Sequence, residues 1–382
     1  MTDPAHWLPL TGESVQSAYT LIKEYVYQTP VLTCKTLNRI ASTPQTPESL
    51  VGTPYEGQTP AKPKINFFFK CENYQRIGAF KVRGAFHSVL RLIQTKGEEE
   101  VRKRGVITHS SGNHAQALAL AAHTLNIPAY IIMPSISTPS KIEGTKSYGA
   151  KVIFSGSTSQ EREAVVADVQ KETGAILVPP YDHPDTILGQ GTVGLELEAQ
   201  VAELLKSNPA LSAHGEKTTG VLDAVVTPTG GAGLTSGVAT FFAGKSTAVF
   251  GSEPSFQGAD DCRRGLESGT RVTSVKSLTI ADGLRTPVGE IPWTIVSDPK
   301  KVRGVYAVSE EQIKGAMRLV LERMKVVIEP SAAVPLAVCL YNEEFRRLVE
   351  REAGDEGWDV GVVFSGGNTT VDAIAELFGK KQ

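Results

Sequence analysis

Short apolar segments alternate along the chain with longer segments in which apolar positions recur every three or four residues. The short segments have the length and composition of buried strands, and the longer ones have the periodicity of a helix with one apolar face. Strands that alternate with helices are typical of an α/β fold with a mostly parallel sheet. The pattern therefore predicts an α/β protein.

The positions of these elements follow from the same pattern. Strands are expected at residues 65–69, 105–108, 129–133, 151–154, 175–178, 224–227, 248–252, 304–308 and 360–364. Helices are expected at residues 84–94, 113–126, 159–173, 191–206, 234–242, 310–323 and 332–341.

The length of the chain favours two domains over one. At 382 residues it exceeds the size at which a single hydrophobic core usually stops growing. Residues 105–182 alternate compactly between strands and helices and are predicted to be a small domain, inserted into a large domain made of residues 1–104 and 183–382. Two polar segments, 41–64 and 205–220, are predicted to be surface loops.

The composition is that of an ordinary globular protein, with 41% hydrophobic and 21% charged residues. A net charge of -2 gives no reason to expect nucleic acid or a membrane surface as a partner, and no apolar stretch is long enough to span a bilayer. Residues 1–10 do not have the pattern of a signal peptide, and the four cysteines are scattered without a CxxC pair. We therefore predict a reduced, cytoplasmic protein.

Four segments carry candidate chemistry. Lys81 lies in the first, 70–85, and supplies an amine. The second, 110–116, precedes a predicted helix, and free N–H groups at a helix start bind anions. The third, 228–234, is a glycine loop without the GxGxxG pattern of a nucleotide site, and the fourth, 365–368, begins with a serine hydroxyl. An amine, two anion cradles and a hydroxyl are what an enzyme needs to use pyridoxal phosphate on an amino acid.

In their order and spacing, these segments resemble the fold type II pyridoxal phosphate enzymes, and among them the serine racemase and serine/threonine dehydratase group. The resemblance implies the α/β fold of the tryptophan synthase β-subunit, with two three-layer domains and the cofactor between them. It also implies a homodimer that binds an amino-acid substrate, pyridoxal 5′-phosphate, a divalent cation and a nucleotide effector.

The resemblance assigns roles to single residues. Lys81 would carry the cofactor and, once released from it, move the proton at the substrate Cα, for which burial must lower its pKa. A lysine is more often a solvated surface charge, and that alternative stays open. The family usually has glycine where this chain has Ala232. The other cofactor contacts would come from Phe80, from Asn113 at the phenolic oxygen, from Gly230, Gly231, Ala232, Gly233 and Leu234 at the phosphate, and from Ser365 at the ring nitrogen.

The second segment would hold the substrate carboxylate and supply another proton-transfer group. Racemisation needs such a group on each face of the planar carbanion, and in serine racemases a serine at the position of Ser111 lies opposite the lysine. The alternative is that Ser111 only caps the following helix. Members that replace a β-substituent typically read SGNTG here, unlike this chain. The carboxylate contacts would be Ser110, Ser111, Gly112, Asn113 and His114.

Two acidic residues are candidate cation ligands. By resemblance to serine racemases, Glu253, Asp261 and the carbonyl of Ala259 would hold Mg²⁺, or Ca²⁺ or Mn²⁺ in its place. The loop between the two acids is longer than the family pattern because it contains residues 256–258. The alternative is a pair of solvated surface acids.

The sequence thus predicts an enzyme that eliminates water from L-serine, L-threonine or a related amino acid such as 3-hydroxyaspartate, giving a 2-oxo acid and ammonia, with serine racemisation beside it. A pure dehydratase without racemisation is the main alternative. A β-replacement synthase is disfavoured by the motif at 110–116, and a non-catalytic cofactor-binding protein is disfavoured by the presence of Lys81, Ser111 and Asn113 together.

Overall fold

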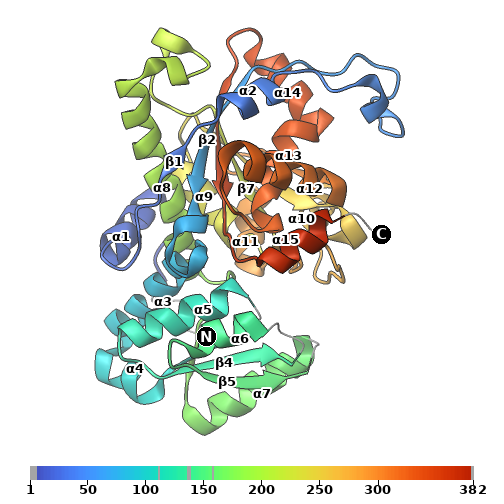
Figure 1. Ribbon diagram of the computed structural model, residues 1–382. Coiled ribbons are helices and arrows are strands. Elements are labelled where there is room, and N and C mark those ends of the chain that lie inside the picture. Colours follow the sequence, from blue (N-terminus) through green and yellow to red (C-terminus); the bar gives the residue numbers. More distant parts are fainter. Residues whose placement is uncertain (1–6, 111, 136–138, 157–158, 380–382) are drawn as a thin grey trace.

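The computed structural model describes residues 7–110, 112–135, 139–156 and 159–379. In this part of the chain the strands form a six-stranded and a four-stranded sheet, which Figure 1 shows one above the other. The strands are β1 (Val31–Leu32), β2 (Ile65–Cys71), β3 (Val106–His109), β4 (Ala129–Pro134), β5 (Lys151–Ser155), β6 (Ile176–Leu177), β7 (Ala224–Pro228), β8 (Ala248–Pro254), β9 (Gly304–Val308) and β10 (Trp358–Phe364).

Helices cover both sheets. They are α1 (Gly12–Ile22), α2 (Lys35–Ala41), α3 (Lys81–Lys96), α4 (Glu98–Arg104), α5 (Asn113–Thr124), α6 (Pro139–Lys146), α7 (Ser159–Thr173), α8 (Pro184–Ser207), α9 (Gly233–Phe242), α10 (Asp261–Ser268), α11 (Glu290–Val296), α12 (Glu310–Leu319), α13 (Pro330–Tyr341), α14 (Glu343–Ala353) and α15 (Val371–Phe378). None of the described helices combines the length and the apolar character that crossing a membrane requires.

The six-stranded sheet has the order β1-β2-β10-β7-β8-β9, and only the β1–β2 pair is antiparallel. Successive side chains of a strand point to opposite faces, and β2 shows this alternation. Phe67 and Phe69 pack into one core with α2, α12 and α13, while Phe68 packs into a second core with α1, α8 and α9. Both faces of the sheet are therefore buried, as a parallel sheet requires.

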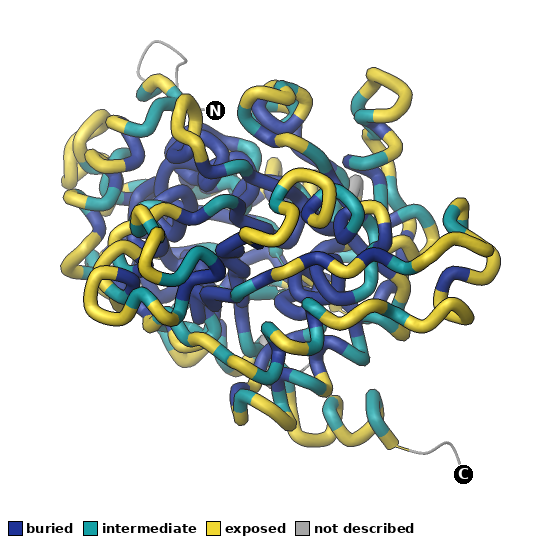
Figure 2. Tube along the Cα trace, turned by 90° about the horizontal axis from the view of Figure 1, so that it is seen from above, coloured by how far each residue is buried: buried dark blue, intermediate teal, exposed yellow. Residues whose placement is uncertain are grey.

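The four-stranded sheet, of order β5-β4-β3-β6, is parallel throughout and is also covered on both faces. Ile131 and Met133 join a core with α3 and α5, while Ile107 and Ile132 join a smaller core with α7. Each sheet is thus the middle of three layers. In Figure 2 the buried residues form the interior of the molecule and the exposed ones follow its outer loops.

The predicted domain division stays a prediction, although all strands of the smaller sheet lie within residues 105–182. Helix α3 precedes that range, yet its side chains Phe86 and Val89 belong to the core of the smaller sheet. The same helix also packs on α8, which lies against the larger sheet. It therefore connects the two cores.

All the predicted strands and helices are present, most with ends shifted by a few residues, whereas α8 begins seven residues before the predicted start at residue 191. The pattern missed short elements such as β1, α2 and α10, and also the amphipathic helices α1 and α14. The segment 41–64 is mostly exposed, as predicted, and Arg346 on α14 holds it by donating to the carbonyls of Ala41, Thr43 and Ala61. The prediction of a loop from residue 205 was wrong for three residues, because α8 continues to Ser207.

A fully buried network of charges joins β2, α3 and α8. Arg83 donates to both oxygens of Glu72 (2.7 and 2.8 Å) and to both oxygens of Glu196 (2.9 and 2.8 Å). Lys70 donates to Glu196 at 2.7 Å. Burial alone would raise the pKa of Glu72, but the Arg83 guanidinium outweighs it, and the pKa lies below its ordinary value. Two cations and two carboxylates therefore compensate one another without water.

This network gives the first testable expectation. Glu196→Gln should leave Lys70 and Arg83 with one carboxylate between them, and the loss of one member of a buried ion pair costs about 3–5 kcal/mol of unfolding free energy. Urea denaturation at neutral pH would measure the fall.

The control is Glu198→Gln on the same helix, because Glu198 pairs at 2.7 Å with Lys245 at the surface. Exposed pairs contribute only about 0–1 kcal/mol. Equal effects of the two substitutions would contradict the importance assigned to the buried network.

Candidate active site

The predicted site residues lie at the carboxyl ends of parallel strands, where α/β proteins usually bind ligands. In the larger sheet, β7 leads into the glycine loop, β8 into Glu253 and its loop, and β10 into Ser365. In the smaller sheet, β3 leads into the segment that ends at Asn113. Hydrogen bonds of Asn113 with Glu329 and Asn368 join the two sets.

Lys81 begins α3 and is partly buried. Its Nζ donates a hydrogen bond of 2.7 Å to the carbonyl of Pro180, and it lies 5.1 Å from the centre of the Phe80 ring. Burial lowers the pKa of Lys81 to about 8. A lysine whose pKa lies near neutrality can both take and give a proton at physiological pH. The bond of its Nζ to the Pro180 carbonyl is evidence against a freely solvated surface lysine.

The backbone before Lys81 is fastened to the segment after β10. The N–H of Phe80 donates to the carbonyl of Ser365 at 3.1 Å, and the N–H of Gly367 donates to the carbonyl of Gly78 at 2.9 Å. Gly78 has a φ of 72°, and a Cβ there would fall 2.6 Å from the side chain of Asn368. Only glycine fits this position. The buried Ser365 is therefore held beside Phe80 and Lys81.

Asn113 is oriented by a chain of hydrogen bonds. Its Nδ2 donates to Oε1 of Glu329 at 2.9 Å, and its Oδ1 accepts from Nδ2 of Asn368 at 2.7 Å. Asn368 also donates to the carbonyl of Ile77 at 2.8 Å. The amide of Asn113 thus has a fixed orientation, with one N–H that neither of these bonds uses.

The rest of the predicted carboxylate segment begins α5. Ser110 accepts the N–H of Gly112 on its hydroxyl at 3.2 Å, which bends the chain into the helix. The imidazole of His114 bonds through Nε2 to the carbonyl of Val178 at 3.1 Å, and burial together with the charge of Lys81 lowers its pKa to about 3. A neutral side chain held in this way leaves the backbone N–H as the anion contact that His114 can offer. Ser111 lies outside the described residues.

The glycine loop between β7 and α9 is packed against side chains that leave no room for a Cβ. A Cβ at Gly231 would lie 2.5 Å from the ring of Tyr181, and one at Gly233 would lie 2.6 Å from Oε1 of Gln190. Ala232 adopts the left-handed conformation, with a φ of 64°. The chain thus places alanine where glycine would be less strained. Gly230 packs on Leu284, and Leu234 lies in the first turn of α9.

The predicted cation ligands are buried, so the alternative of two solvated acids is excluded. Glu253 accepts the N–H groups of Cys262 and Arg263 at 2.9 and 3.0 Å. Asp261 accepts the N–H of Val288 on Oδ2 at 3.0 Å, while its buried Oδ1 has no partner among the described residues. Burial raises the pKa of Glu253 well above its ordinary value and that of Asp261 to about 6. An unpartnered buried carboxylate oxygen beside a second carboxylate fits a hard cation.

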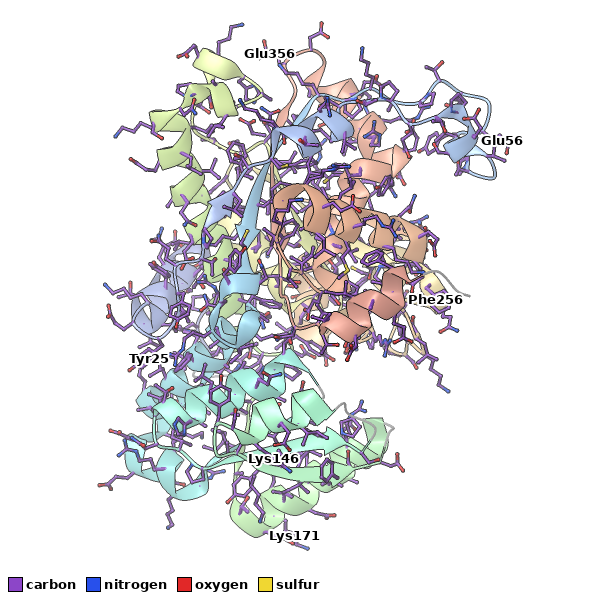
Figure 3. The ribbon with its side chains drawn as sticks, in the orientation of Figure 1. Tyr25, Glu56, Lys146, Lys171, Phe256 and Glu356 are labelled. Carbon is purple, nitrogen blue, oxygen red and sulfur yellow. The ribbon has the colours of Figure 1, made fainter. Side chains whose placement is uncertain are left out.

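The longer loop leaves this pair in place. Phe256 is 41% exposed, and residues 256–258 form a short turn, whereas Ala259 is fully buried. Figure 3 shows Phe256 at the outer edge of the molecule. The additional residues therefore lie at the surface, and Ala259 and Asp261 stay inside.

One segment, Val288 to Ile291, connects the acidic pair with the glycine loop. Val288 donates to Asp261, and the next residue, Gly289, donates to the carbonyl of Gly231 at 3.2 Å. Asp182, which follows Tyr181, accepts the N–H groups of Glu290 and Ile291 at 2.9 Å each. A shift of the acidic pair would therefore reach the glycine loop through two adjacent peptide groups.

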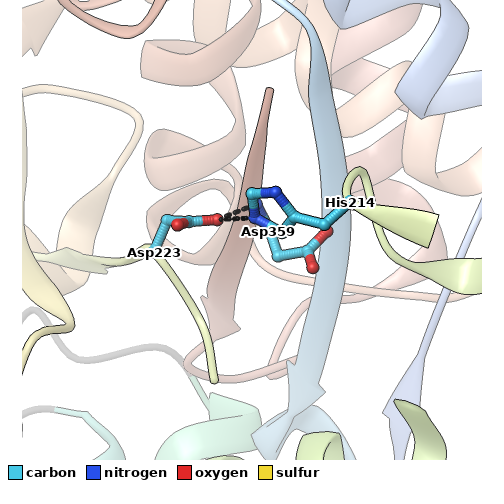
Figure 4. Close-up of side chains that lie close together, drawn as sticks. All are labelled: His214, Asp223 and Asp359. Atoms are coloured by element: carbon cyan, nitrogen blue, oxygen red, sulfur yellow. Dashed lines mark hydrogen bonds and ion pairs between the residues drawn. The ribbon is translucent and has the colours of Figure 1, made fainter. Parts of the chain in front are cut away.

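A further group of possible metal ligands was not predicted from the sequence and consists of His214, Asp223 and Asp359 (Figure 4). Their ligand atoms lie within 4.8 Å of one another at the amino ends of β7 and β10. Asp223 bonds to the imidazole at 2.9 Å, and both oxygens of Asp359 accept from Ser212 and Ala213. These bonds fix residues 212–214 to the amino ends of β7 and β10, which is a structural role.

Among the residues that contact the predicted site without having been predicted are Pro180, Tyr181, Gln190 and Glu329. A signal was present for the last two, because segment 189–192, which contains Gln190, and segment 328–331, which contains Glu329, also match the family pattern. Nothing in the residue types of Pro180 and Tyr181 pointed to the site. They reach it because the chain passes beside Lys81 and the glycine loop on its way from β6 to α8.

Comparison with known proteins agrees with these features. A family model described as pyridoxal-phosphate dependent enzyme matches residues 51–366. The serine racemase of Oryza sativa is 36% identical over 96% of this chain and 94% of its own, and the L-threo-3-hydroxyaspartate ammonia-lyase of Saccharomyces cerevisiae is 37% identical over 98% of both. The structure of maize serine racemase has a TM-score of 0.77 and 36% identity over 96% of each chain.

The strained position in the glycine loop can be tested directly. Ala232→Gly should stabilise the protein by about 0.5–1 kcal/mol, because relief of the left-handed strain exceeds the added freedom of the unfolded chain. The control, Ala243→Gly, changes the exposed residue at the other end of α9, where φ is -56°, and should cost about 0.5–1 kcal/mol. Thermal denaturation measures both, and a loss of stability in both variants would contradict the assignment of strain.

Proposed function

The chain belongs to the pyridoxal-phosphate dependent enzymes, and we propose that it acts on L-serine, L-threonine or a related β-hydroxy amino acid such as 3-hydroxyaspartate. It eliminates water from the substrate, giving a 2-oxo acid and ammonia, and it interconverts the two enantiomers of serine. The observation that carries the proposal is the Lys81 amine, which lies at the junction of the two sheets with its pKa lowered to about 8.

Pyridoxal phosphate, when bound, would withdraw electrons from the substrate Cα and so make its proton acidic. The chain supplies the groups that bind and orient. Backbone N–H groups of residues 230–234 would hold the phosphate at the start of α9, and Asn113, fixed by Glu329, would offer its unused N–H to the phenolic oxygen. Ser365 would offer the ring nitrogen a neutral hydroxyl, and the segment 110–114 would receive the substrate carboxylate.

Lys81 takes the proton from the Cα, which its low pKa allows at neutral pH. The β-hydroxyl then leaves, and together with the proton taken from the Cα it accounts for the water that is eliminated. Hydrolysis of the resulting enamine gives the 2-oxo acid and ammonia. Racemisation differs only in the next proton transfer, because a proton must reach the opposite face of the Cα. Ser111 supplies that proton in our proposal, which rests on the resemblance of residues 110–116 to the serine racemases.

A divalent cation is the second proposed ligand. Glu253, Asp261 and the Ala259 carbonyl hold Mg²⁺, with Ca²⁺ or Mn²⁺ as substitutes, because all three offer the oxygen atoms that these ions prefer. The unpartnered Oδ1 of Asp261 supports this assignment. Two buried carboxylates without a counter-charge cost free energy, and a cation bound between them would compensate their charge.

A homodimer and a nucleotide effector are proposed on the resemblance to serine racemases alone. A location in the cytoplasm and the division into a small domain of residues 105–182 and a larger one of residues 1–104 and 183–382 are proposed from the sequence pattern. A dehydratase without racemisation is the second candidate function, favoured by the 37% identity to the yeast ammonia-lyase over 98% of the chain.

Separate assays of the two products test the proposal and distinguish the candidates. Ser111→Ala should lose D-serine formation from L-serine by roughly 10²–10⁴-fold, because one proton-transfer group is missing. Formation of pyruvate and ammonia should survive in large part, since that reaction uses Lys81. Chiral analysis of the recovered serine and a keto-acid assay give both rates from one reaction mixture.

Lys81→Ala is the control and should lose both products together with the visible absorbance of the bound cofactor. A wild-type protein that forms 2-oxo acid and no D-amino acid would leave the pure dehydratase. A wild-type protein that forms neither product from the whole panel of β-hydroxy amino acids would refute the proposed function.

The cation can be tested by its removal. EDTA should lower activity and added Mg²⁺ should restore it, and the melting temperature should rise with Mg²⁺ because the ion binds the folded state only. Asp261→Ala should abolish both responses, whereas Asp260→Ala, which changes the adjacent residue, should keep them. Identical melting temperatures with EDTA and with Mg²⁺ would mean that the acidic pair binds no cation.

A further inference from the structure

We infer that Gln190 and the carbonyl of Pro180 form a binding position for the Lys81 amine, and that Gln190 is a positioning residue for the proton transfer at the substrate Cα. This inference rests on the proposed function, since it concerns the step in which Lys81 carries a free amine.

The Pro180 carbonyl is the common acceptor in this arrangement. It accepts the Nζ of Lys81 at 2.7 Å and the Nε2 of Gln190 at 3.3 Å. Proline has no N–H and a fixed φ, so the peptide that carries this oxygen is stiff. Thr186 adds to this by donating to the preceding carbonyl, that of Pro179, at 3.0 Å. The Lys81 amine therefore has a defined hydrogen-bond acceptor whenever it is not bound to the cofactor.

Gln190 lies where the elements of the site meet. It is fully buried on α8, and its side chain packs on Gly84 of α3, where a Cβ would come within 3.1 Å of its Cγ. Its Oε1 would be 2.6 Å from a Cβ at Gly233, in the glycine loop. One side chain thus touches the helix that bears Lys81, the carbonyl that holds its amine and the proposed phosphate cradle.

The Oε1 of Gln190 is buried and has no hydrogen-bond partner among the described residues. A buried amide oxygen without a donor costs free energy, about 1–3 kcal/mol in mutational studies. Leucine or methionine would fill the same space without this cost. The glutamine is therefore better explained by what its other end does, which is to hold the Pro180 carbonyl toward Lys81.

The amine binds among uncharged groups. His114 on α5 is neutral because its pKa is about 3, and burial raises the pKa of Tyr181, beside Pro180, to about 12. Two acids of the site bind other groups, since Glu329 accepts from Asn113 and Asp182 accepts from the first N–H groups of α11. A neutral acceptor orients the amine without stabilising its protonated form as a carboxylate would.

Exchange of the glutamine for glutamate should therefore change the acid–base behaviour of Lys81. Gln190→Glu keeps the size of the side chain and places a carboxylate next to the amine. An opposite charge at this range raises the pKa of a lysine by roughly 1–3 pH units. Gln190→Leu removes the hydrogen bond to Pro180 without adding charge, so it should disturb the position of the amine and leave its pKa near that of the wild type.

The test follows the rate at which the full-length protein, freed of cofactor and kept in Mg²⁺, regains visible absorbance when pyridoxal phosphate is added. The Lys81 amine must be uncharged to react with the aldehyde, so the pH midpoint of this rate reports its pKa. We expect a midpoint near 8 for the wild type and a higher one for Gln190→Glu. At pH 8 a shift of one unit alone slows the variant by about five-fold, because the uncharged fraction falls from about one half to about one tenth.

Gln170→Glu is the matched control. Gln170 on α7 also donates its amide to a backbone carbonyl, that of Ala175 at 3.0 Å, but it is half-buried on a helix that packs on β3 and β4, away from Lys81. It should load cofactor with the wild-type midpoint. In the loaded enzymes, the rise of kcat with pH should move to higher pH for Gln190→Glu alone, and Gln190→Leu should lower kcat several-fold with KM within about two-fold of the wild type.

Equal midpoints and equal pH profiles for the wild type and Gln190→Glu would overturn the inference. If circular dichroism shows that Gln190→Glu does not fold, the test rests on Gln190→Leu. An unchanged kcat in Gln190→Leu would also overturn the inference. A wild-type protein that gains no visible absorbance would instead refute the proposed function, so the two failures can be told apart.

Discussion

The position of Lys81 depends on Arg83, two residues further along the same helix. The guanidinium of Arg83 binds Glu72 on one side and Glu196 on the other, so it fixes α3 between the end of β2 and the middle of α8. Because the network is fully buried, any rotation of α3 would separate charges that water cannot reach. The direction in which Lys81 leaves the start of the helix is therefore set by a set of ion pairs that takes no part in the chemistry.

The two lysines of this region show how strongly the surroundings decide what a charge does. Lys70 is fully buried, but it is paired with Glu196 and also donates to the carbonyl of Thr29, so its charge is compensated. Lys81 lies among neutral groups, and burial lowers its pKa to about 8. The fold thus places two carboxylates against Arg83 and an uncharged acceptor against Lys81. A structural lysine and the lysine proposed to be reactive can then lie close together in the chain.

The sequence was sufficient to predict the sheets and the contiguous segments that meet at the candidate site, because these features depend on residues that are close together in the chain. Parallel strands buried on both faces give short apolar runs that are easily recognised, and the segments around Lys81, Asn113 and the glycine loop are contiguous. Amphipathic helices with few apolar positions, such as α14, gave a weaker signal. Pro180, Gln190 and Glu329 act through contacts with residues that are distant in the sequence, and such contacts leave no periodic trace. The left-handed φ of Ala232 could likewise not be read from its residue type.

The glycines of the loop between β7 and α9 meet two separate structural requirements. A phosphate needs backbone N–H groups that no side chain shields. In this protein the same glycines are also required by the residues behind them, since Tyr181 and Gln190 occupy the space that Cβ atoms at Gly231 and Gly233 would need. Tyr181 and Gln190 flank or contact Pro180, which holds the Lys81 amine. The packing that forces glycine into the loop is therefore the packing that places the Lys81 amine, so the proposed phosphate cradle and the proposed base are held together by one set of contacts.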